Sequence, residues 1–287
     1  MPSAGELLQR GAAQLKEAGV ERPWSEALLL LAWALGRSQA ALLAHPELVL
    51  KPEEVRRFSL GLAQRRARKP LAYITESKSF LHWDFFVRKG VLIPRPETEL
   101  LAELAAAQVK RYFPADDLLL ADIGTGCGAI GLSLLLLLPG ARLLAVDSSP
   151  RALETAKINA RRLGVESRAF FVGGDLLAPL GPWRGNLACI TANLPYIPEG
   201  EYGGLQPEVR EYEPKEALVS GPDGLDHYRS LLAEAGKTLV SGGLLLVEIG
   251  DRQGERVLKL FRRGGFPAPE IKKDLAGLDR IVWARKP

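Results

Sequence analysis

The amino-acid sequence predicts a doubly wound α/β domain with a largely parallel sheet, preceded by a small helical bundle and a β-hairpin. Residues 5–68 show helical periodicity without a strand pattern, and residues 73–93 are rich in aromatic and β-branched side chains. From residue 118 onward, short apolar strands alternate with helices of about 10 to 15 residues, which is typical of a parallel sheet. We therefore expect three parts: a helical bundle at 1–70, a β-hairpin linker at 71–97 and an α/β domain at 98–287.

The N-terminal part contains four predicted helices. Leu7, Leu8 and Leu15 lie on one helical stripe that Gly19 ends, and Pro23 begins the next helix. The later helices are expected at 25–35, 38–44 and 52–68. The last one ends in a basic cluster, Arg65, Arg66, Arg68 and Lys69. We interpret this cluster as the solvated end of a helix, and an acidic partner is the alternative.

The α/β part begins with a helix from Glu97, after the break at Pro94-Arg95-Pro96. The predicted strands are 118–123, 142–147, 169–172, 187–192, 243–249 and 280–284. The predicted helices between and after them are 129–138, 150–163, 225–240 and 254–261. Ligands of such sheets bind at the carboxyl ends of the strands, so we expect the functional residues in the loops there.

Composition narrows the class of protein. The chain has 287 residues, 47% of them hydrophobic and 25% charged, which excludes a disordered or fibrous protein. Two separate cysteines and three scattered histidines indicate neither a disulfide framework nor a metal site. No signal peptide and no apolar run near the roughly 20 residues of a membrane span are present. We expect a cytoplasmic protein, monomeric and without a metal.

A glycine-rich loop follows the first predicted strand, from Gly124 through Thr125, Gly126 and Cys127 to Gly128. Glycines let the backbone turn sharply and approach a ligand closely. The spacing differs from the dinucleotide pattern G-x-G-x-x-G, and no phosphate-binding lysine follows. The loop therefore predicts a ligand over the first strand-to-helix turn, and disfavours a nucleoside triphosphate.

Two aspartates follow the next two strands. Asp147 ends the second strand, where an acid can accept hydrogen bonds from ribose hydroxyls. The alternative is an N-cap for the helix at Pro150, although Ser148 and Ser149 could serve there. Asp175 is suited to an adenine amino group, and a turn aspartate is the alternative. This set of acids around a glycine loop resembles the Rossmann-like methyltransferases that bind S-adenosylmethionine.

Asn193-Leu194-Pro195-Tyr196 follows the fourth strand, at the same sheet edge. It resembles the (Asn/Asp)-Pro-Pro-(Tyr/Phe) motif of methyltransferases that act on nitrogens conjugated to a π-system. An amide nitrogen shares its lone pair with the carbonyl, so two acceptors aimed at its hydrogens would make it more nucleophilic. The resemblance assigns these roles to the Asn193 side-chain oxygen and the Leu194 carbonyl, with Tyr196 packing against the amide. A proline-fixed turn is the alternative.

Further segments resemble the HemK/PrmC-type protein-(glutamine-N5) methyltransferases over essentially the full length. They are Pro70–Ile74, Ile93–Leu100, Glu211–Leu218 and Gly221–Arg229. The resemblance implies a class I methyltransferase domain with a seven-stranded sheet, S-adenosylmethionine as cofactor and bacterial class I peptide-chain release factors as partners. The acceptor would be the glutamine of their Gly-Gly-Gln motif.

The resemblance also implies residue roles. Gly124 to Gly128, Asp147 and Asn193 would contact the cofactor, with Leu176 beside the adenine. Asn193 to Tyr196 would hold the glutamine. Arg95, Pro96 and Glu97 would help to close the pocket, or would simply form a domain-linking turn. The residues from Glu211 to Arg229 are expected to be architectural.

Three positions depart from the family pattern. Leu194 stands where the family usually has proline, but the carbonyl is kept and Pro195 holds Leu194 extended. Glu76 and His82 stand where the family usually has glycine, so the hairpin turn is open to question.

Two alternatives remain at this point. An adenine-N6 methyltransferase of DNA or RNA would use the same loop chemistry on a flipped base, and the basic residues 65–69 give it some support. A cofactor-binding adaptor of a translation factor is the other. The helical N-terminus and the 93–100 segment argue against nucleic acid as the partner, and the intact Asn193 loop argues against a pure adaptor.

Overall fold

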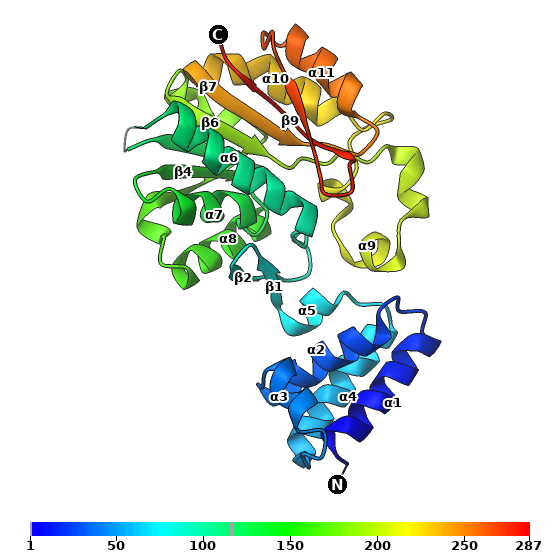
Figure 1. The fold of residues 1–287 in the computed structure, drawn as a ribbon. Coiled ribbons are helices and arrows are strands. Elements are labelled where there is room, and N and C mark those ends of the chain that lie inside the picture. Colours follow the sequence, from blue (N-terminus) through cyan, green and yellow to red (C-terminus); the bar gives the residue numbers. More distant parts are fainter. Residues whose placement is uncertain (1, 115–116) are drawn as a thin grey trace. The chain divides into compact units, whose positions relative to one another are not determined.

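The computed structural model describes residues 2–114 and 117–287, which form two compact units (Figure 1). The smaller unit comprises Met1–Ser77 together with Gln206–Tyr212, and the larger comprises Lys78–Leu205 and Glu213–Pro287. The larger unit contains a seven-stranded, mostly parallel sheet, so the predicted fold class is confirmed. One segment of the later chain, Gln206–Tyr212, thus belongs to the N-terminal unit, which the sequence did not predict.

The N-terminal unit is helical. Its helices are α1 (Ala4–Glu17), α2 (Pro23–Leu35), α3 (Gln39–Ala44), α4 (Pro52–Arg66) and α5 (Leu71–Thr75). Ser3 caps α1 through its side chain, which accepts from the Glu6 amide at 3.2 Å, while the Ser3 amide donates to the Glu6 carboxylate at 3.1 Å. Leu15, Leu30, Leu31 and Phe58 are among the buried side chains of one apolar core. Burial of these faces, which the periodicity predicted, holds the helices together.

An ionic network ties Gln206–Tyr212, which contains α9 (Pro207–Tyr212), to this unit. The Arg65 guanidinium pairs with Glu26 and, at 2.8 Å, with Glu208, and Arg68 pairs with the other Glu208 oxygen at 2.7 Å. Arg65 is only 5% exposed. The interpretation of the basic cluster as a solvated helix end is therefore wrong for Arg65, whose charge is used inside the unit.

The hairpin is shorter than expected. Its strands are β1 (Ser77–Phe80) and β2 (Trp83–Phe86). Tyr73 and Ile74 were predicted as part of it but lie in α5, where they bury their side chains. Glu76 has φ +53° at the end of α5, a conformation that favours glycine, whereas in the turn itself the positive φ falls on Leu81 and not on His82.

The sheet of the larger unit has the order β5-β4-β3-β6-β7-β9-β8. Its strands are β3 (Leu119–Ile123), β4 (Arg142–Asp147), β5 (Ala169–Gly173), β6 (Leu187–Ala192), β7 (Leu239–Glu248), β8 (Glu270–Lys273) and β9 (Asp279–Arg285). The pairs from β5 to β7 are parallel, and β9 is antiparallel to both of its neighbours. The sequence did not predict β8, a short edge strand with one partly buried residue, Ile271.

Helices cover both faces of this sheet (Figure 1). They are α6 (Glu99–Tyr112), α7 (Ala129–Leu137), α8 (Pro150–Arg162), α10 (Asp226–Thr238) and α11 (Gly254–Arg263). The first three pack on one face, and α10 and α11 on the other. Because β3 lies between β4 and β6, the loops after these strands meet at one sheet edge.

Within the described residues, no helix is both long and apolar enough to cross a membrane. The same part of the chain has no group of three or more potential metal-binding side chains. Cys127 and Cys189 are both free and buried, and burial raises the pKa of both thiols.

The Arg65 network provides the first prediction. Arg65→Met leaves the Glu26 and Glu208 carboxylates without their shared partner, so the free energy of unfolding of the N-terminal unit should fall by about 2 kcal/mol. Arg66→Met is the matched control, because Arg66 is exposed and its side chain, among the residues that the structure describes, bonds only Gln14, at 3.3 Å. Urea unfolding of the full chain, followed by far-ultraviolet circular dichroism, measures both. Equal losses in the two variants would contradict the network's role.

Candidate active site

The glycine loop after β3 forms the floor of the site. Gly124, Gly126 and Gly128 have φ values of +71°, +59° and +87°, which only glycine adopts readily. The amides of Gly124 and Thr125 both donate to the Val146 carbonyl at 2.9 Å, which ties the loop to the end of β4. A Cβ atom at Gly126 would meet nothing within 4 Å, so the backbone there faces open space.

Asp122 braces this loop from beneath. Its carboxylate accepts from the hydroxyls of Thr125 at 2.7 Å and Thr191 at 2.9 Å, and from the Gly131 amide at 3.1 Å. The side chain is fully buried, and burial raises the pKa of Asp122 to about 6, although these hydrogen bonds oppose the shift. Asp122 therefore connects β3, the glycine loop, α7 and β6 rather than facing a ligand.

Asp147 is held at the end of β4 by two backbone amides. Its Oδ2 accepts from Gly126 and its Oδ1 from Ser149, both at 2.8 Å. Ser149 serves as the N-cap of α8, accepting from the Ala152 amide at 3.3 Å. The N-cap alternative for Asp147 is therefore wrong. Burial raises the pKa of Asp147, and both amide bonds oppose this.

The loop Asn193–Tyr196 follows β6 and is fixed along its length. Leu194 is 3% exposed and belongs to the apolar core. Its side chain lies so close to Gly124 that a Cβ there would be 3.1 Å from the Leu194 Cδ2 atom. The Tyr196 carbonyl accepts from the Gln253 side-chain amide at 2.9 Å, and the Tyr196 amide donates to the Leu218 carbonyl at 3.2 Å.

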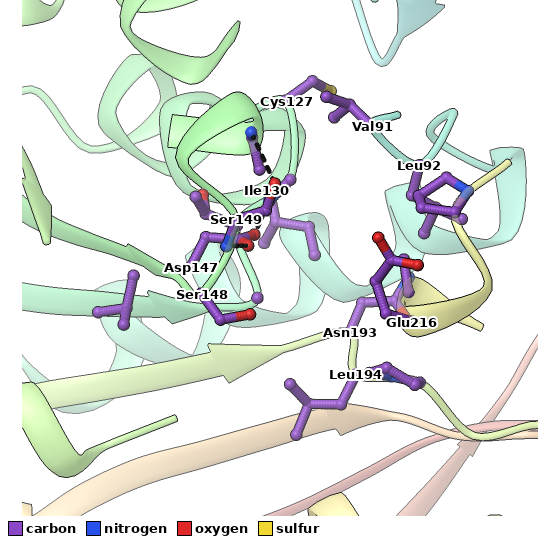
Figure 2. Close-up of a pocket in the computed structure, with 18 of the residues that line it drawn as sticks. Val91, Leu92, Cys127, Ile130, Asp147, Ser148, Ser149, Asn193, Leu194 and Glu216 are labelled. Carbon is purple, nitrogen blue, oxygen red and sulfur yellow. Dashed lines mark hydrogen bonds between the residues drawn. The ribbon is translucent and has the colours of Figure 1, made fainter. Parts of the chain in front are cut away.

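A pocket of about 1040 Å³, open solvent at its mouth included, runs along this edge of the sheet. Figure 2 shows Asp147 and Ser148 on one side of it, and Asn193 and Glu216 on the other. The predicted residues that line it are Arg95, Gly124, Thr125, Gly126, Cys127, Asp147, Asp175, Leu176, Asn193, Leu194 and Pro195. Four predicted residues do not line it: Pro96, Glu97, Gly128 and Tyr196.

These four residues have other positions. Pro96 and Glu97 are exposed at the start of the 3-10 turn Pro96–Thr98. Gly128 ends the glycine loop as the N-cap of α7, where a Cβ would meet the Leu132 side chain at 2.7 Å. Tyr196 lines a neighbouring cavity together with Asp223, Gln253 and other residues.

Several residues of the site were not predicted. Asn159 on α8 is fully buried, and its side-chain amide donates to the carbonyls of Cys127 at 2.8 Å and Phe86 at 2.9 Å. Glu213 accepts from the Ile93 amide at 3.1 Å and from Arg95 at 2.5 Å. The segment 211–229, expected to be architectural, thus holds Arg95, and it also gives Glu216 and His227 to the pocket lining. The sequence signal for Asn159 was its place on the apolar stripe of the predicted helix 150–163, beside Ala152, Ala156 and Ala160.

A sheet of this order, with a glycine loop on its central strand and a pocket along its carboxyl edge, defines a Rossmann-like methyltransferase. The chain is similar in structure to the T. thermophilus 16S rRNA N2 G1207 methyltransferase RsmC in complex with AdoMet and guanosine. The TM-score is 0.53 at 19% identity, over 74% of this chain and 50% of the other. At this identity the likeness supports the fold alone.

Relatives in sequence narrow the class. The chain is 45% identical to the release factor glutamine methyltransferase of Moorella thermoacetica over 282 residues, which is 98% of this chain and 96% of the relative. It is 40% identical to that of Cereibacter sphaeroides over 99% of both chains. Residues 6–75 match the PrmC N-terminal domain, and residues 101–178 match the precorrin methyltransferase domain. The chain belongs to the release factor glutamine methyltransferase family.

The Asp122 brace gives a prediction about pH. The pKa of Asp122 is raised from 3.8 to about 6 in the folded chain, so the folded state holds this proton more tightly than the unfolded state. The contribution of Asp122 to the stability of the folded state is largest at low pH and is lost as pH rises through about 6. Wild type should therefore lose about 1 kcal/mol of stability relative to Asp122→Asn between pH 5 and pH 8.

Urea unfolding of both proteins without cofactor at the two pH values measures this difference. Both proteins carry the same other titrating groups, so the pH dependence of stability that those groups cause cancels in the difference between the two proteins. A stability difference that does not change with pH would mean that Asp122 is not strained by burial.

Proposed function

We propose that this enzyme transfers the methyl group of S-adenosylmethionine to the side-chain amide nitrogen of the glutamine in the Gly-Gly-Gln motif of class I release factors. One observation carries the proposal. Within the described residues, neither the Asn193 Oδ1 atom nor the Leu194 carbonyl accepts a hydrogen bond, although both belong to the loop at the pocket. Two adjacent free acceptors match the two hydrogens of a primary amide.

The pocket residues fit the cofactor. Asp147 uses one lone pair of each carboxylate oxygen on a backbone amide, which leaves capacity for two ribose hydroxyls. Asp175 and Leu176 line the same pocket and would hold the adenine. The open space over Gly126 would accept the methionine part of the molecule. When bound, S-adenosylmethionine supplies a methyl group on a positively charged sulfur. No metal is part of this proposal.

The residues at the acceptor end would act by positioning and polarisation. The Asn193 Oδ1 atom and the Leu194 carbonyl would each accept one hydrogen of the glutamine amide, which directs the nitrogen lone pair toward the methyl group. These acceptors also favour the positive charge that develops on the nitrogen. The product nitrogen loses its proton readily, so no strong base is required.

Tyr196 would contact the acceptor from the other side of the loop. Its cavity of about 770 Å³ of empty space, open solvent included, is bordered by Pro198, Asp223 and Arg256. We propose that the acceptor peptide approaches here, and that its glutamine passes over the loop toward the pocket. The tyrosine ring would then pack against the planar amide.

The helical unit is the proposed release-factor recognition module. Its surface exposes apolar side chains, with Trp24 47%, Val49 61% and Leu60 56% exposed, and such side chains can contact a protein partner. The basic residues 65–69 give little support to nucleic acid, because Arg65 and Arg68 pair with Glu208. A cytoplasmic location would suit two free thiols.

Labelled S-adenosylmethionine tests the acceptor directly. The enzyme is incubated with a bacterial class I release factor, with the same factor carrying Gly-Gly-Glu in place of Gly-Gly-Gln, and with DNA and RNA. Label should enter the unaltered factor alone. Label on nucleic acid but not on the factor would contradict the proposal, and label on both factors would place the modification elsewhere.

Loop variants provide the next prediction. Asn193→Ala should lower kcat by at least about a hundredfold, because an acceptor for the amide is lost. Leu194→Pro keeps the carbonyl, so kcat should stay within roughly tenfold of wild type. Its stability should fall by about 1–2 kcal/mol, because the buried leucine side chain is shortened. Steady-state kinetics and urea unfolding separate the two effects, and a much larger kcat loss in Leu194→Pro would refute the role of its carbonyl.

A further inference from the structure

A buried carboxyl group lies next to the loop Asn193–Tyr196. Glu248 is the last residue of β7, next to β6 in the sheet, and is 1% exposed. The side chains of Thr98 and Asn193 lie close enough to act on its carboxyl group, and each works to lower its pKa. Its Oε2 atom has no hydrogen-bond partner within the described residues. No sequence pattern assigned a role to Glu248.

The hydrogen bonds around Glu248 have a defined direction. The Asn193 Nδ2 atom donates to the Thr98 hydroxyl at 3.1 Å, so the single Thr98 hydrogen is free to point at Glu248. A carboxylate can only accept, so the Asn193 group that can donate to Glu248 is Nδ2 and not Oδ1. The amide nitrogen of Asn193 thus faces the protein side, which leaves Oδ1 free for the acceptor amide.

We propose that Glu248 is a positioning residue, which together with Thr98 fixes the orientation of the Asn193 amide so that its oxygen, and not its nitrogen, faces the methyl acceptor. This inference rests on the proposed function. It concerns orientation alone, because Glu248 does not line the pocket. Thr98 does line it and is 3% exposed, so it joins the buried acid to the loop.

Glu248 has both a positively and a negatively charged side chain near it. Arg280 on β9 and Glu97 in the turn before α6 act on it with opposite signs, and the hydroxyls of Tyr196 and Tyr228 are nearby. Burial is the largest influence and raises the pKa of Glu248 to about 7. A protonated Glu248 could donate to Thr98, which would permit the whole chain of hydrogen bonds to reverse and the Asn193 amide to turn over.

Glu248→Gln imitates the protonated state of Glu248 at every pH, because a glutamine side chain has nearly the same shape and can donate a hydrogen bond to Thr98. We expect kcat for release-factor methylation to fall roughly 10- to 100-fold, with the KM for the factor and the cofactor Kd within about threefold of wild type. Wild-type kcat should fall as pH is lowered below about 7, and Glu248→Gln should lack this dependence.

Variants of Thr98 test independently whether Glu248 and Thr98 orient the Asn193 amide. Thr98→Val removes the hydroxyl at nearly constant volume and should lower kcat in the same way, while Thr98→Ser should restore most of the loss. The double variant Glu248→Gln, Thr98→Val should be no slower than the slower single variant, because both act through Asn193. Thr238→Val is the control: Thr238 is a buried threonine on α10, bonded to the Glu234 carbonyl at 3.0 Å and remote from the pocket lining.

The outcomes separate the two proposals. Methylation by wild type together with an unchanged kcat in Glu248→Gln would overturn the inference alone. A kcat loss in Thr238→Val as large as in Thr98→Val would also overturn it, because the effect would then be one of general stability. A wild-type enzyme that does not methylate the release factor would overturn the proposed function and the inference with it.

Discussion

The site depends on one buried carboxylate, that of Asp122. Four parts of the large unit meet at it, because it accepts from the glycine loop, from the start of α7 and from Thr191 on β6. Burial of this group is unfavourable for its charged form, so the three hydrogen bonds are needed to keep it there. They fix the glycine loop relative to β6, from which the loop Asn193–Tyr196 starts. The two halves of the site therefore share one support.

The loop Asn193–Tyr196 is then held from several directions. Leu194 packs in the core against Gly124, Gln253 holds the Tyr196 carbonyl, and Thr98 holds the Asn193 amide. The Asn193 side chain and the Leu194 backbone are thereby held in place, which would leave little reorganisation for the proposed reaction. The apolar core packs around Leu194 and holds the backbone at this position, so we expect leucine to serve there as well as proline.

The sequence predicted strand bounds closely where a continuous apolar run is bounded by polar loops. The strands ending at Asp147 and Ala192 begin and end where expected, because continuous apolar runs bounded by polar loops have few alternative readings. Local patterns could not predict β8 or the helical state of Tyr73, which depend on neighbours far along the chain. The glycine loop and Asn193 were found from residue type and spacing. Glu248, Glu213 and Asn159 were missed, since their contacts join residues between 32 and 150 positions apart.

The central claim, that the nitrogen and not the oxygen of the Asn193 side-chain amide is turned toward the protein, can be measured by NMR. The chain has three asparagines, so a sample labelled with ¹⁵N-asparagine gives three side-chain amide pairs. Two are internal references: Asn159 is fully buried and bonded at both hydrogens, and Asn186 is exposed. The Asn193 pair, identified by its absence in Asn193→Asp, should exchange slowly with water, as Asn159 does. Exchange as rapid as that of Asn186 would contradict the account.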